Sequence, residues 1–219
     1  VRRIKPDGTI ISPIDFIPVY EKSGLISRLD RYIWEQAAAK LGEWKKAGIN
    51  MSISVNISPK DFYYIDIFNT FAGLIKKYDI EPSNLKIEIT ETTIMSDVPN
   101  LMGELEELRK AGFTLEMDDF GSGYSSLNTL KDINVDVLKV DMGFIKETKN
   151  VKKSRIILAS VIKMAKELNL LIITEGVETE EQVDNLTKLG CDVFQGYYFS
   201  KAIDVNEFEK RYLYRKKAG

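Results

Sequence analysis

The sequence predicts an α/β fold in which parallel strands alternate with helices. Two observations carry this prediction: short β-branched runs recur along the chain, and amphipathic helical periods lie between them. The expected strands are six segments rich in valine, isoleucine and leucine: residues 53–57, 85–90, 114–117, 137–140, 170–174 and 193–199. Six strand–helix units in a row fit either an open doubly wound sheet or a (β/α)8 barrel.

The helices between these strands follow from apolar residues that recur every three or four positions. In residues 101–112 three leucines share one helical face, and in residues 157–168 apolar residues repeat with the same helical spacing. Residues 179–182 are typical of a capping box, and Gly190 of the matching C-terminal stop. Further helices are expected at residues 13–23, 31–46 and 68–77.

A polar side chain follows each apolar strand, and this favours the barrel. The strand-end residues are Asn56, Glu88, Asp118, Asp119, Lys139, Asp141, Glu175 and Gln195. In a TIM barrel the carboxyl ends of all strands meet at one mouth, where the active sites of that fold lie. Neither a GxGxxG motif nor a P-loop is present to support a nucleotide-binding open sheet. A barrel needs eight strands, so the two further strands are expected at the N-terminal end, where they are truncated or missing.

Composition limits the possible chemistry. The 219 residues are 44% hydrophobic and carry a net charge of −2, which predicts one domain over residues 1–219 and argues against sequence-independent nucleic-acid binding. The single cysteine, Cys191, excludes an internal disulfide and fits a reducing, cytoplasmic compartment. No apolar run approaches the length of a membrane span. Histidine is absent, so imidazole can serve neither as a base nor as a metal ligand.

Three strand-end carboxylates suggest a cation site, although each has an ordinary structural explanation. Glu88 shares a strand face with Lys86 and Thr90, and a carboxylate inside a barrel needs a cation. Asp118 and Asp119 repel each other unless a metal ion or a lysine neutralises them. Taken alone, however, an Asp-Asp pair is also a common turn motif.

The other strand-end residues extend this hypothesis. Lys139 lies between two apolar residues of an expected buried strand and could supply a fixed positive charge. Glu175 ends an apolar run. Glu178 is also explained by a position in the first turn of a helix, where acidic residues are common. Asn56 is also explained as the cap of the next helix. Amide and carboxylate oxygens without imidazole or thiolate suit Mg²⁺ or Mn²⁺, and the number of carboxylates suggests two ions. The residues thus predict a metal-dependent barrel enzyme that acts on phosphate, without naming its substrate.

Eight short motifs make the chain resemble the EAL domain family. In chain order they are SPIDFIP at 12–18, EKSGL at 21–25, SVNIS at 54–58, EITE at 88–91, DDFGSGYSSL at 118–127, LKVD at 138–141, EGVE at 175–178 and FQGY at 194–197. The resemblance runs from Val1 to about Phe208. It implies a TIM-like barrel with one reversed strand, and hydrolysis of cyclic di-GMP to linear pGpG with Mg²⁺ or Mn²⁺ in bacterial signalling.

The resemblance also implies which residues do the chemistry. The metal ligands would be Asn56, Glu88, Asp118, Asp119 and Glu175. The catalytic groups would be Asp119, Glu175 beside the attacking water as ligand or base, and Lys139, which orients that water. Substrate contacts would come from Arg2, Pro13 and Gln195. Glu91 and Glu178 would anchor the loop of residues 120–127, which the family links to dimerisation and metal binding.

The resemblance leaves one departure and two alternatives. The Glu-Ala-Leu tripeptide of the family, whose glutamate is a metal ligand, would occupy the three positions ahead of Val1 and is not in this chain. One alternative is a cyclic di-GMP receptor without catalysis. The other is a barrel enzyme that forms a Schiff base through Lys139, which neighbouring carboxylates disfavour because they raise a lysine's pKa. The family further implies a homodimer and a possible upstream GGDEF or sensory domain, and we expect no contact with duplex nucleic acid or a membrane.

Overall fold

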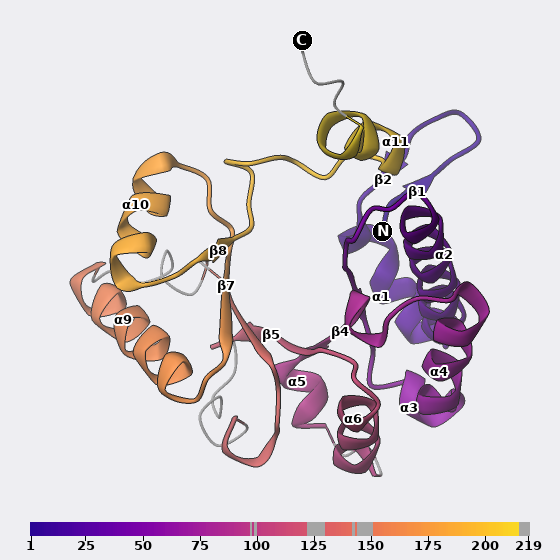
Figure 1. Ribbon diagram of the computed structural model, residues 1–219, viewed down its shortest axis with the longest axis horizontal. Coiled ribbons are helices and arrows are strands. Elements are labelled where there is room, and N and C mark those ends of the chain that lie inside the picture. Colours follow the sequence, from indigo (N-terminus) through magenta and orange to yellow (C-terminus); the bar gives the residue numbers. More distant parts are fainter. Residues whose placement is uncertain (97, 99, 122–129, 142, 144–150, 215–219) are drawn as a thin grey trace. The chain divides into compact units, whose positions relative to one another are not determined.

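The computed structural model describes residues 1–214 apart from 97, 99, 122–129, 142 and 144–150 (Figure 1). The chain divides into two compact units. The N-terminal unit comprises residues 1–117 and 125–135, and the C-terminal unit comprises residues 118–124 and 136–219.

The six expected strands are present and follow one another in the sheet order β3-β4-β5-β6-β7-β8. Their bounds are Ile53–Asn56 for β3, Leu85–Thr90 for β4, Leu115–Phe120 for β5, Val137–Asp141 for β6, Leu171–Glu175 for β7 and Val193–Phe194 for β8. The pairs β3–β4, β6–β7 and β7–β8 are parallel. Strand β8 is shorter than expected because Gly196 opens a turn in which the Tyr198 N–H donates to the carbonyl of Val177 at 3.1 Å.

The N-terminal unit packs helices against its strands and carries a small hairpin that the sequence did not predict. The helices are α1 (Pro13–Ser23), α2 (Ile26–Lys46), α3 (Asp61–Tyr64), α4 (Ile67–Tyr78), the 3₁₀ turn η1 (Pro82–Asn84), α5 (Glu91–Ile94) and α6 (Leu101–Lys110). The hairpin pairs β1 (Arg3–Ile4) with β2 (Ile10–Ile11) in antiparallel register. Strands of two residues are too short for alternation to show in a sequence.

The core of the N-terminal unit forms where α2 and α4 meet β3 and β4. Trp34 of α2 is fully buried, and its ring centroid lies 4.9 Å from that of Phe71 in α4. Phe71 in turn contacts Phe113, with 5.7 Å between ring centroids and an edge-to-face geometry that aromatic pairs favour. Helix α2 begins five residues before its expected start, because no capping side chain at Leu25 marks that start.

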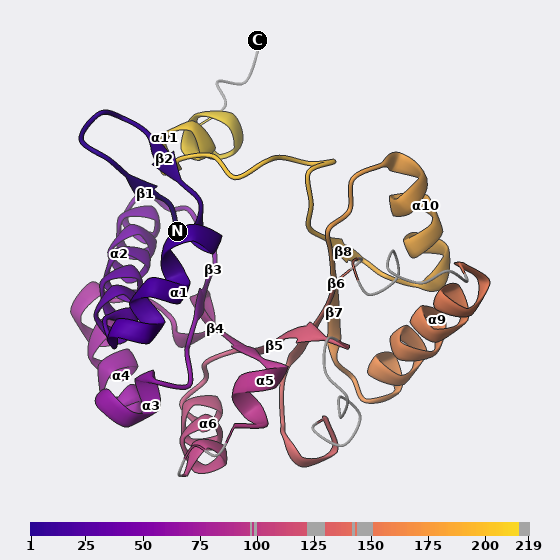
Figure 2. The ribbon, with the colours of Figure 1, turned by 180° about the vertical axis from the view of Figure 1, so that it is seen from behind.

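The C-terminal unit contains β6, β7 and β8 together with helices. The helices are α9 (Val151–Glu167), α10 (Glu180–Leu189), α11 (Val205–Phe208) and the π-helical turn η2 (Glu209–Leu213). Both ribbon views show α9 and α10 on the same side of β7 (Figures 1 and 2). The predicted capping box at Thr179 and Gln182 is confirmed, as is the left-handed Gly190 that ends α10. Cys191 is buried in the core of this unit, as expected.

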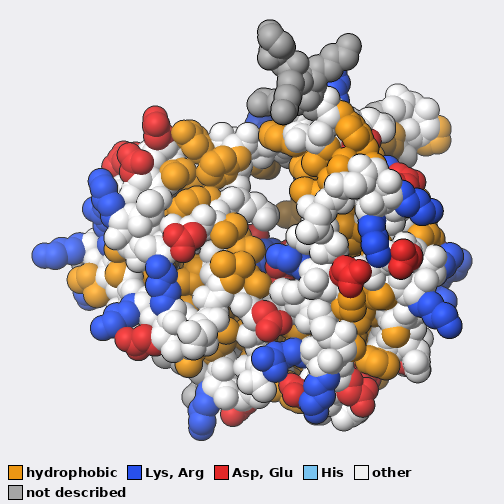
Figure 3. Space-filling model, in the orientation of Figure 1, with side chains coloured by type: hydrophobic (Ala, Val, Ile, Leu, Met, Phe, Trp, Pro, Cys, Tyr) orange, Lys and Arg blue, Asp and Glu red, His pale blue; other side chains and the backbone are white. Residues whose placement is uncertain are grey.

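The surface matches the near-neutral composition. On the face drawn in Figure 3, acidic and basic side chains are interspersed rather than gathered by sign. In the part of the chain that the structure describes, no helix is both long enough and apolar enough to span a bilayer.

Candidate active site

Strand alternation directs the polar residues of β4 and β5 to one face of the sheet. Along β4, residues 85, 87 and 89 are buried, whereas residues 86, 88 and 90 are half-buried on the opposite face. Along β5, Glu116 and Asp118 have the same parity, so both project from the face opposite Leu115 and Met117. Glu88 in the N-terminal unit and Asp118 in the C-terminal unit therefore each project from the less buried face of their own strand.

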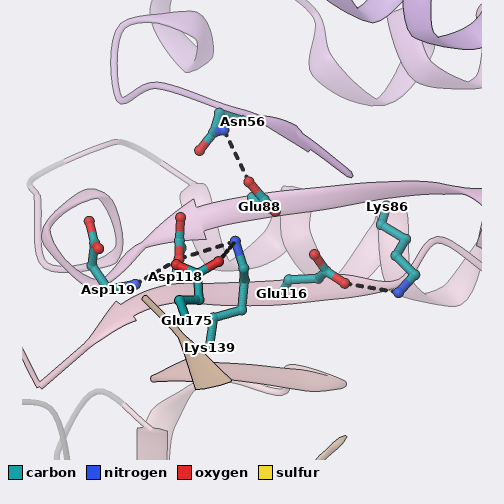
Figure 4. Close-up of polar contacts among 8 residues, drawn as sticks. All are labelled: Asn56, Lys86, Glu88, Glu116, Asp118, Asp119, Lys139 and Glu175. Carbon is teal, nitrogen blue, oxygen red and sulfur yellow. Dashed lines mark hydrogen bonds and ion pairs between the residues drawn. The ribbon is translucent and has the colours of Figure 1, made fainter. Parts of the chain in front are cut away.

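Asn56 and Glu88 form a pair of candidate site residues within the N-terminal unit. They are register partners on neighbouring parallel strands, and the Asn56 amide donates to the Glu88 carboxylate at 3.0 Å (Figure 4). The indole N–H of Trp34 donates to the Asn56 carbonyl at 2.9 Å, which ties the end of β3 to the core. Because the Asn56 amide gives its N–H to Glu88, its carbonyl oxygen Oδ1 is left to accept a hydrogen bond or to ligate a cation.

Lys139 is the centre of a cluster of candidate site residues within the C-terminal unit. It is 4% exposed on β6, and its ammonium lies 2.8 Å from Glu175 Oε1 and 3.3 Å from Asp118 Oδ1 (Figure 4). Burying an isolated ammonium at this depth would cost much free energy, and the two carboxylates offset that cost by supplying opposite charge. The structure thus brings together three of the predicted site residues, from β5, β6 and β7.

Asp119 follows on the same strand in an uncommon backbone conformation. Its φ is +55°, a left-handed value that aspartate tolerates better than most residues, and its N–H donates to Asp118 Oδ1 at 3.0 Å. Burial, and then the negative charges of Asp118 and Asp141, raise the pKa of the Asp119 carboxyl. A bound cation would relieve this repulsion.

A second ion pair, which the sequence reasoning missed, lies on the same strand face. Lys86 Nζ is 3.1 Å from Glu116 Oε1, and the Glu116 side chain is only 1% exposed (Figure 4). The available signal was a glutamate inside the apolar run 113–117, at the same parity as Asp118. Lys86 was recognised as sharing a face with Glu88, but its partner depends on the neighbouring strand.

The comparisons with known proteins identify the family. The family model described as "EAL domain" matches residues 1–202. The chain belongs to the EAL domain family. This membership confirms the expected TIM-like α/β fold, and the sheet of β3 to β8 with its covering helices agrees with it.

Relatives of this EAL domain include signalling proteins. It is 35% identical over 96% of its length to "Signaling protein YkoW" of Bacillus subtilis, covering 26% of that protein. It is 34% identical over 92% of its length to "Bifunctional diguanylate cyclase/cyclic di-GMP phosphodiesterase MucR" of Pseudomonas aeruginosa, covering 30% of that protein. The chain thus spans about a quarter to a third of these relatives.

Solved structures include a close match with a ligand. The structure described as "PaMucR Phosphodiesterase, c-di-GMP complex" superimposes with a TM-score of 0.87 at 34% identity, over 94% of this chain and 84% of that one. The homologues of this EAL domain thus include named cyclic di-GMP phosphodiesterases, and one solved relative is described as a cyclic di-GMP complex.

The predicted substrate contacts of the EAL domain occupy different surroundings. Pro13 begins α1 and lines a cavity of about 600 Å³, within the N-terminal unit, that Asn56 also lines. Arg2 is exposed, and its guanidinium donates to the carbonyl of Val1 at 2.7 Å. Gln195 is exposed beyond β8, where its N–H donates to the Thr174 carbonyl at 2.8 Å. The substrate roles of these residues stay predictions.

The two predicted anchoring glutamates differ in burial. Glu91 is fully buried as the first residue of α5, directly after β4. Glu178 is exposed before α10, and its backbone N–H donates to the Gln182 side chain at 2.6 Å, which supports the simpler role of a residue at a helix start. Of the loop 120–127, only Phe120 and Gly121 lie within the described residues. That Glu91 and Glu178 anchor this loop therefore stays a prediction.

An acidic pair that sequence reasoning did not find has one member, Asp30, at the cavity that Asn56 lines. Asp30 of α2 lines this cavity, and Asp61 at the start of α3 is fully buried and accepts the Ser58 N–H at 2.8 Å. Burial, and then the neighbouring Asp61, raise the pKa of Asp30 to about 8. Burial likewise raises the pKa of Asp61. The pair therefore retains a proton at neutral pH.

The donors of the candidate site fit a hard divalent cation. They are amide and carboxylate oxygens, the ligands that Mg²⁺ and Mn²⁺ prefer, and the chain has no histidine to bind a softer metal. Among the described residues, no three acidic side chains are already gathered as a preformed metal cluster. The ligand assignments are therefore proposals, supported by the Asn56–Glu88 and Asp118–Asp119 pairs.

Proposed function

We propose that this EAL domain is a phosphodiesterase that hydrolyses cyclic di-GMP to linear pGpG with two divalent cations, Mg²⁺ or Mn²⁺. The observation that carries the proposal is the buried Lys139 between Asp118 and Glu175. A lysine in this setting costs free energy to bury, and a fold does not need it, since branched aliphatic residues usually fill such positions. Its presence in a family with named cyclic di-GMP phosphodiesterases favours catalysis.

The cations would be held by oxygen donors at the ends of β3, β4 and β5. Asn56, Glu88 and Asp118 would hold the first cation and Asp119 the second, with Glu175 as a further ligand at the end of β7. Such cations lower the pKa of bound water and offset the negative charge that develops on a phosphodiester. Burial and then the charges of Asp118 and Asp141 raise the pKa of Asp119, and a second cation would remove the part of that shift that comes from repulsion.

The side chains of the C-terminal unit would move the proton and position the nucleophile. Glu175 would accept the proton of the attacking water. Lys139, which the carboxylates of Asp118 and Glu175 face, would orient the water and offset charge on the reacting phosphate. Arg2, Pro13 and Gln195 would contact the substrate, with Pro13 at the cavity that Asn56 also lines.

The cellular setting belongs to the same proposal. The chain spans about a third or less of relatives such as MucR, whose name records a diguanylate cyclase activity as well. We propose that this EAL domain belongs to a multidomain protein with an upstream GGDEF or sensory domain. It would act in the cytoplasm, where a free buried thiol such as Cys191 stays reduced, and as a homodimer.

The test is turnover of cyclic di-GMP followed by chromatography in the full-length protein, with Mg²⁺ or Mn²⁺ and with a chelator. We expect pGpG to form only with metal. The Asp118→Asn variant should lose more than about a hundredfold in turnover, since even indirect partners of metal ligands are worth about 10- to 100-fold. The matched control is Asp184→Asn, which removes the same charge from an exposed site on α10 and should retain activity.

Two results would contradict the proposal in different ways. Cyclic di-GMP binding without turnover would mean a receptor and would overturn the roles of Glu175 and Lys139. Turnover that survives both the chelator and Asp118→Asn would overturn the metal site while leaving the substrate assignment intact.

A further inference from the structure

The Lys86–Glu116 ion pair has no role in the proposed chemistry, yet it lies beside the residues that do. Lys86 is two residues before Glu88 on β4, and Glu116 is two residues before Asp118 on β5. Residues two apart on a strand project from the same face, about 7 Å apart along the strand. The pair is therefore the next layer of side chains below the candidate cation ligands.

The burial of the pair argues against a purely structural purpose. Glu116 is 1% exposed, and its second oxygen, Oε2, is buried and has no hydrogen-bond partner among the residues that the structure describes. An ion pair at this depth gives little or no net stability compared with apolar side chains of similar volume. A carboxylate with one unsatisfied oxygen is a further cost, so the fold alone would favour leucine or methionine at these two positions.

The charges of the pair act on the cation site in opposite directions. A negative charge about 7 Å from a divalent cation attracts it, and a positive charge at a similar distance repels it. Inside a protein these interactions are stronger than in water, because the effective dielectric constant is lower. Of the two charges, that of Glu116 is the less screened by solvent, since its side chain is the more deeply buried.

We propose that the Lys86–Glu116 pair sets the cation affinity of the site, with Glu116 strengthening and Lys86 weakening the binding of the divalent ion. Both are positioning residues that touch neither the ion nor the substrate. Lys86 also limits repulsion among the carboxylates when no cation is bound, which keeps the site open to reversible loading. This inference rests on the proposed function, in that a divalent cation must bind at the ligands proposed above.

The test is a direct titration with Mn²⁺ in the full-length protein, in which the electron paramagnetic resonance signal of free Mn²⁺ reports binding without any turnover. Binding that the Asp118→Asn variant lacks is assigned to this site. Glu116→Gln keeps a partner for Lys86 and should weaken Mn²⁺ binding roughly tenfold. Lys86→Met keeps the aliphatic stem and should tighten binding severalfold.

The matched controls change the net charge equally but far from the strands. Lys163 and Glu167 form an exposed ion pair on α9, with 3.9 Å between Nζ and Oε1. Glu167→Gln and Lys163→Met should leave Mn²⁺ affinity within about twofold of the wild type, because solvent screens exposed charges. If Lys86→Met does not fold, the double variant Lys86→Met/Glu116→Leu removes both charges and should bind Mn²⁺ within severalfold of the wild type.

Opposite shifts in the two single variants establish the electrostatic role, because loss of a structural support would weaken binding in both. Equal weakening in Glu116→Gln and Lys86→Met, a strong loss in the double variant, or no change in Glu116→Gln would overturn the inference while leaving the proposed function standing. Absence of Mn²⁺ binding at this site in the wild type would instead overturn the metal-dependent function itself, and this inference with it.

Discussion

Trp34 connects the hydrophobic core to a predicted metal ligand. Its ring is fully buried against Phe71, while its indole N–H donates a hydrogen bond to the backbone carbonyl of Asn56 at 2.9 Å. Trp34→Phe removes the donor and leaves a void, so we expect a loss of about 2–3 kcal/mol in the free energy of unfolding. We also expect weaker Mn²⁺ binding, because the end of β3 is then less firmly placed. Urea denaturation and Mn²⁺ titration measure the two effects.

Trp44 provides the matched control for this prediction. It is also buried on α2, but ten residues further along, which is about 15 Å on a helix. Trp44→Phe should lower stability by a comparable amount and leave Mn²⁺ affinity unchanged. If both variants weaken Mn²⁺ binding equally, the effect comes from general loss of stability and not from the hydrogen bond to Asn56.

At this scale the sequence showed which residues are unusual but not which of them meet. Lys139 was visible as a lysine inside an apolar strand, and the structure indeed buries it. The Lys86–Glu116 and Asp30–Asp61 pairs were not visible, because each joins residues about 30 positions apart. Such pairings depend on which strands and helices are neighbours, and alternation within one strand does not contain that information.

Among the elements, the crossing of α2 and α4 depends on a glycine. A Cβ added at Gly42 would lie 2.8 Å from the carbonyl oxygen of Tyr78, a backbone atom that cannot move without shifting the end of α4. Alanine is the better helix former by about 1 kcal/mol, but this steric overlap outweighs that gain. We therefore expect Gly42→Ala to lower the free energy of unfolding by roughly 1–3 kcal/mol, measured by urea denaturation.

Gly73, on α4, is the control of opposite sign. It is an exposed helical glycine, and a Cβ there would meet nothing within 4 Å. Gly73→Ala should therefore raise the free energy of unfolding by about 0.5–1 kcal/mol. If Gly42→Ala is stabilising as well, α2 and α4 can move apart at Gly42 without cost. Their close approach would then not contribute to the stability of this unit.

The elements themselves were the part of the fold that the sequence predicted best. The predicted bounds of α1 and β4 agree with the structure, because a helical period and an alternating strand each leave a strong local signal. The C-terminal end of β8 was expected too far along the chain, because the turn at Gly196 depends on the backbone of Val177 in another segment. Local patterns predict an element, whereas tertiary contacts decide where it ends.

For the molecule as a whole, the proton held by Asp30 and Asp61 makes stability depend on pH. The pKa of Asp30 is raised from 3.8 to about 8 when the chain folds, chiefly by burial and then by Asp61. Between about pH 4 and pH 8 the unfolded chain has released a proton that the folded chain still holds. Because the unfolded state then binds fewer protons, the free energy of unfolding falls as pH rises through this window, by at most about 1.4 kcal/mol per pH unit.

Urea denaturation at pH 5, 6, 7 and 8 measures this dependence, and Asp61→Asn identifies its source. Asparagine at this position can still accept the Ser58 N–H but carries no charge, so Asp30 loses the neighbour that raises its pKa. The variant should show a shallower decline than the wild type and be the more stable of the two at pH 8. Asp184→Asn removes an exposed carboxylate and should keep the wild-type slope. A wild-type stability that rises from pH 5 to pH 8, or an unchanged slope in Asp61→Asn, would show that the two carboxyls titrate independently and that the cavity wall beside Asn56 is charged at neutral pH.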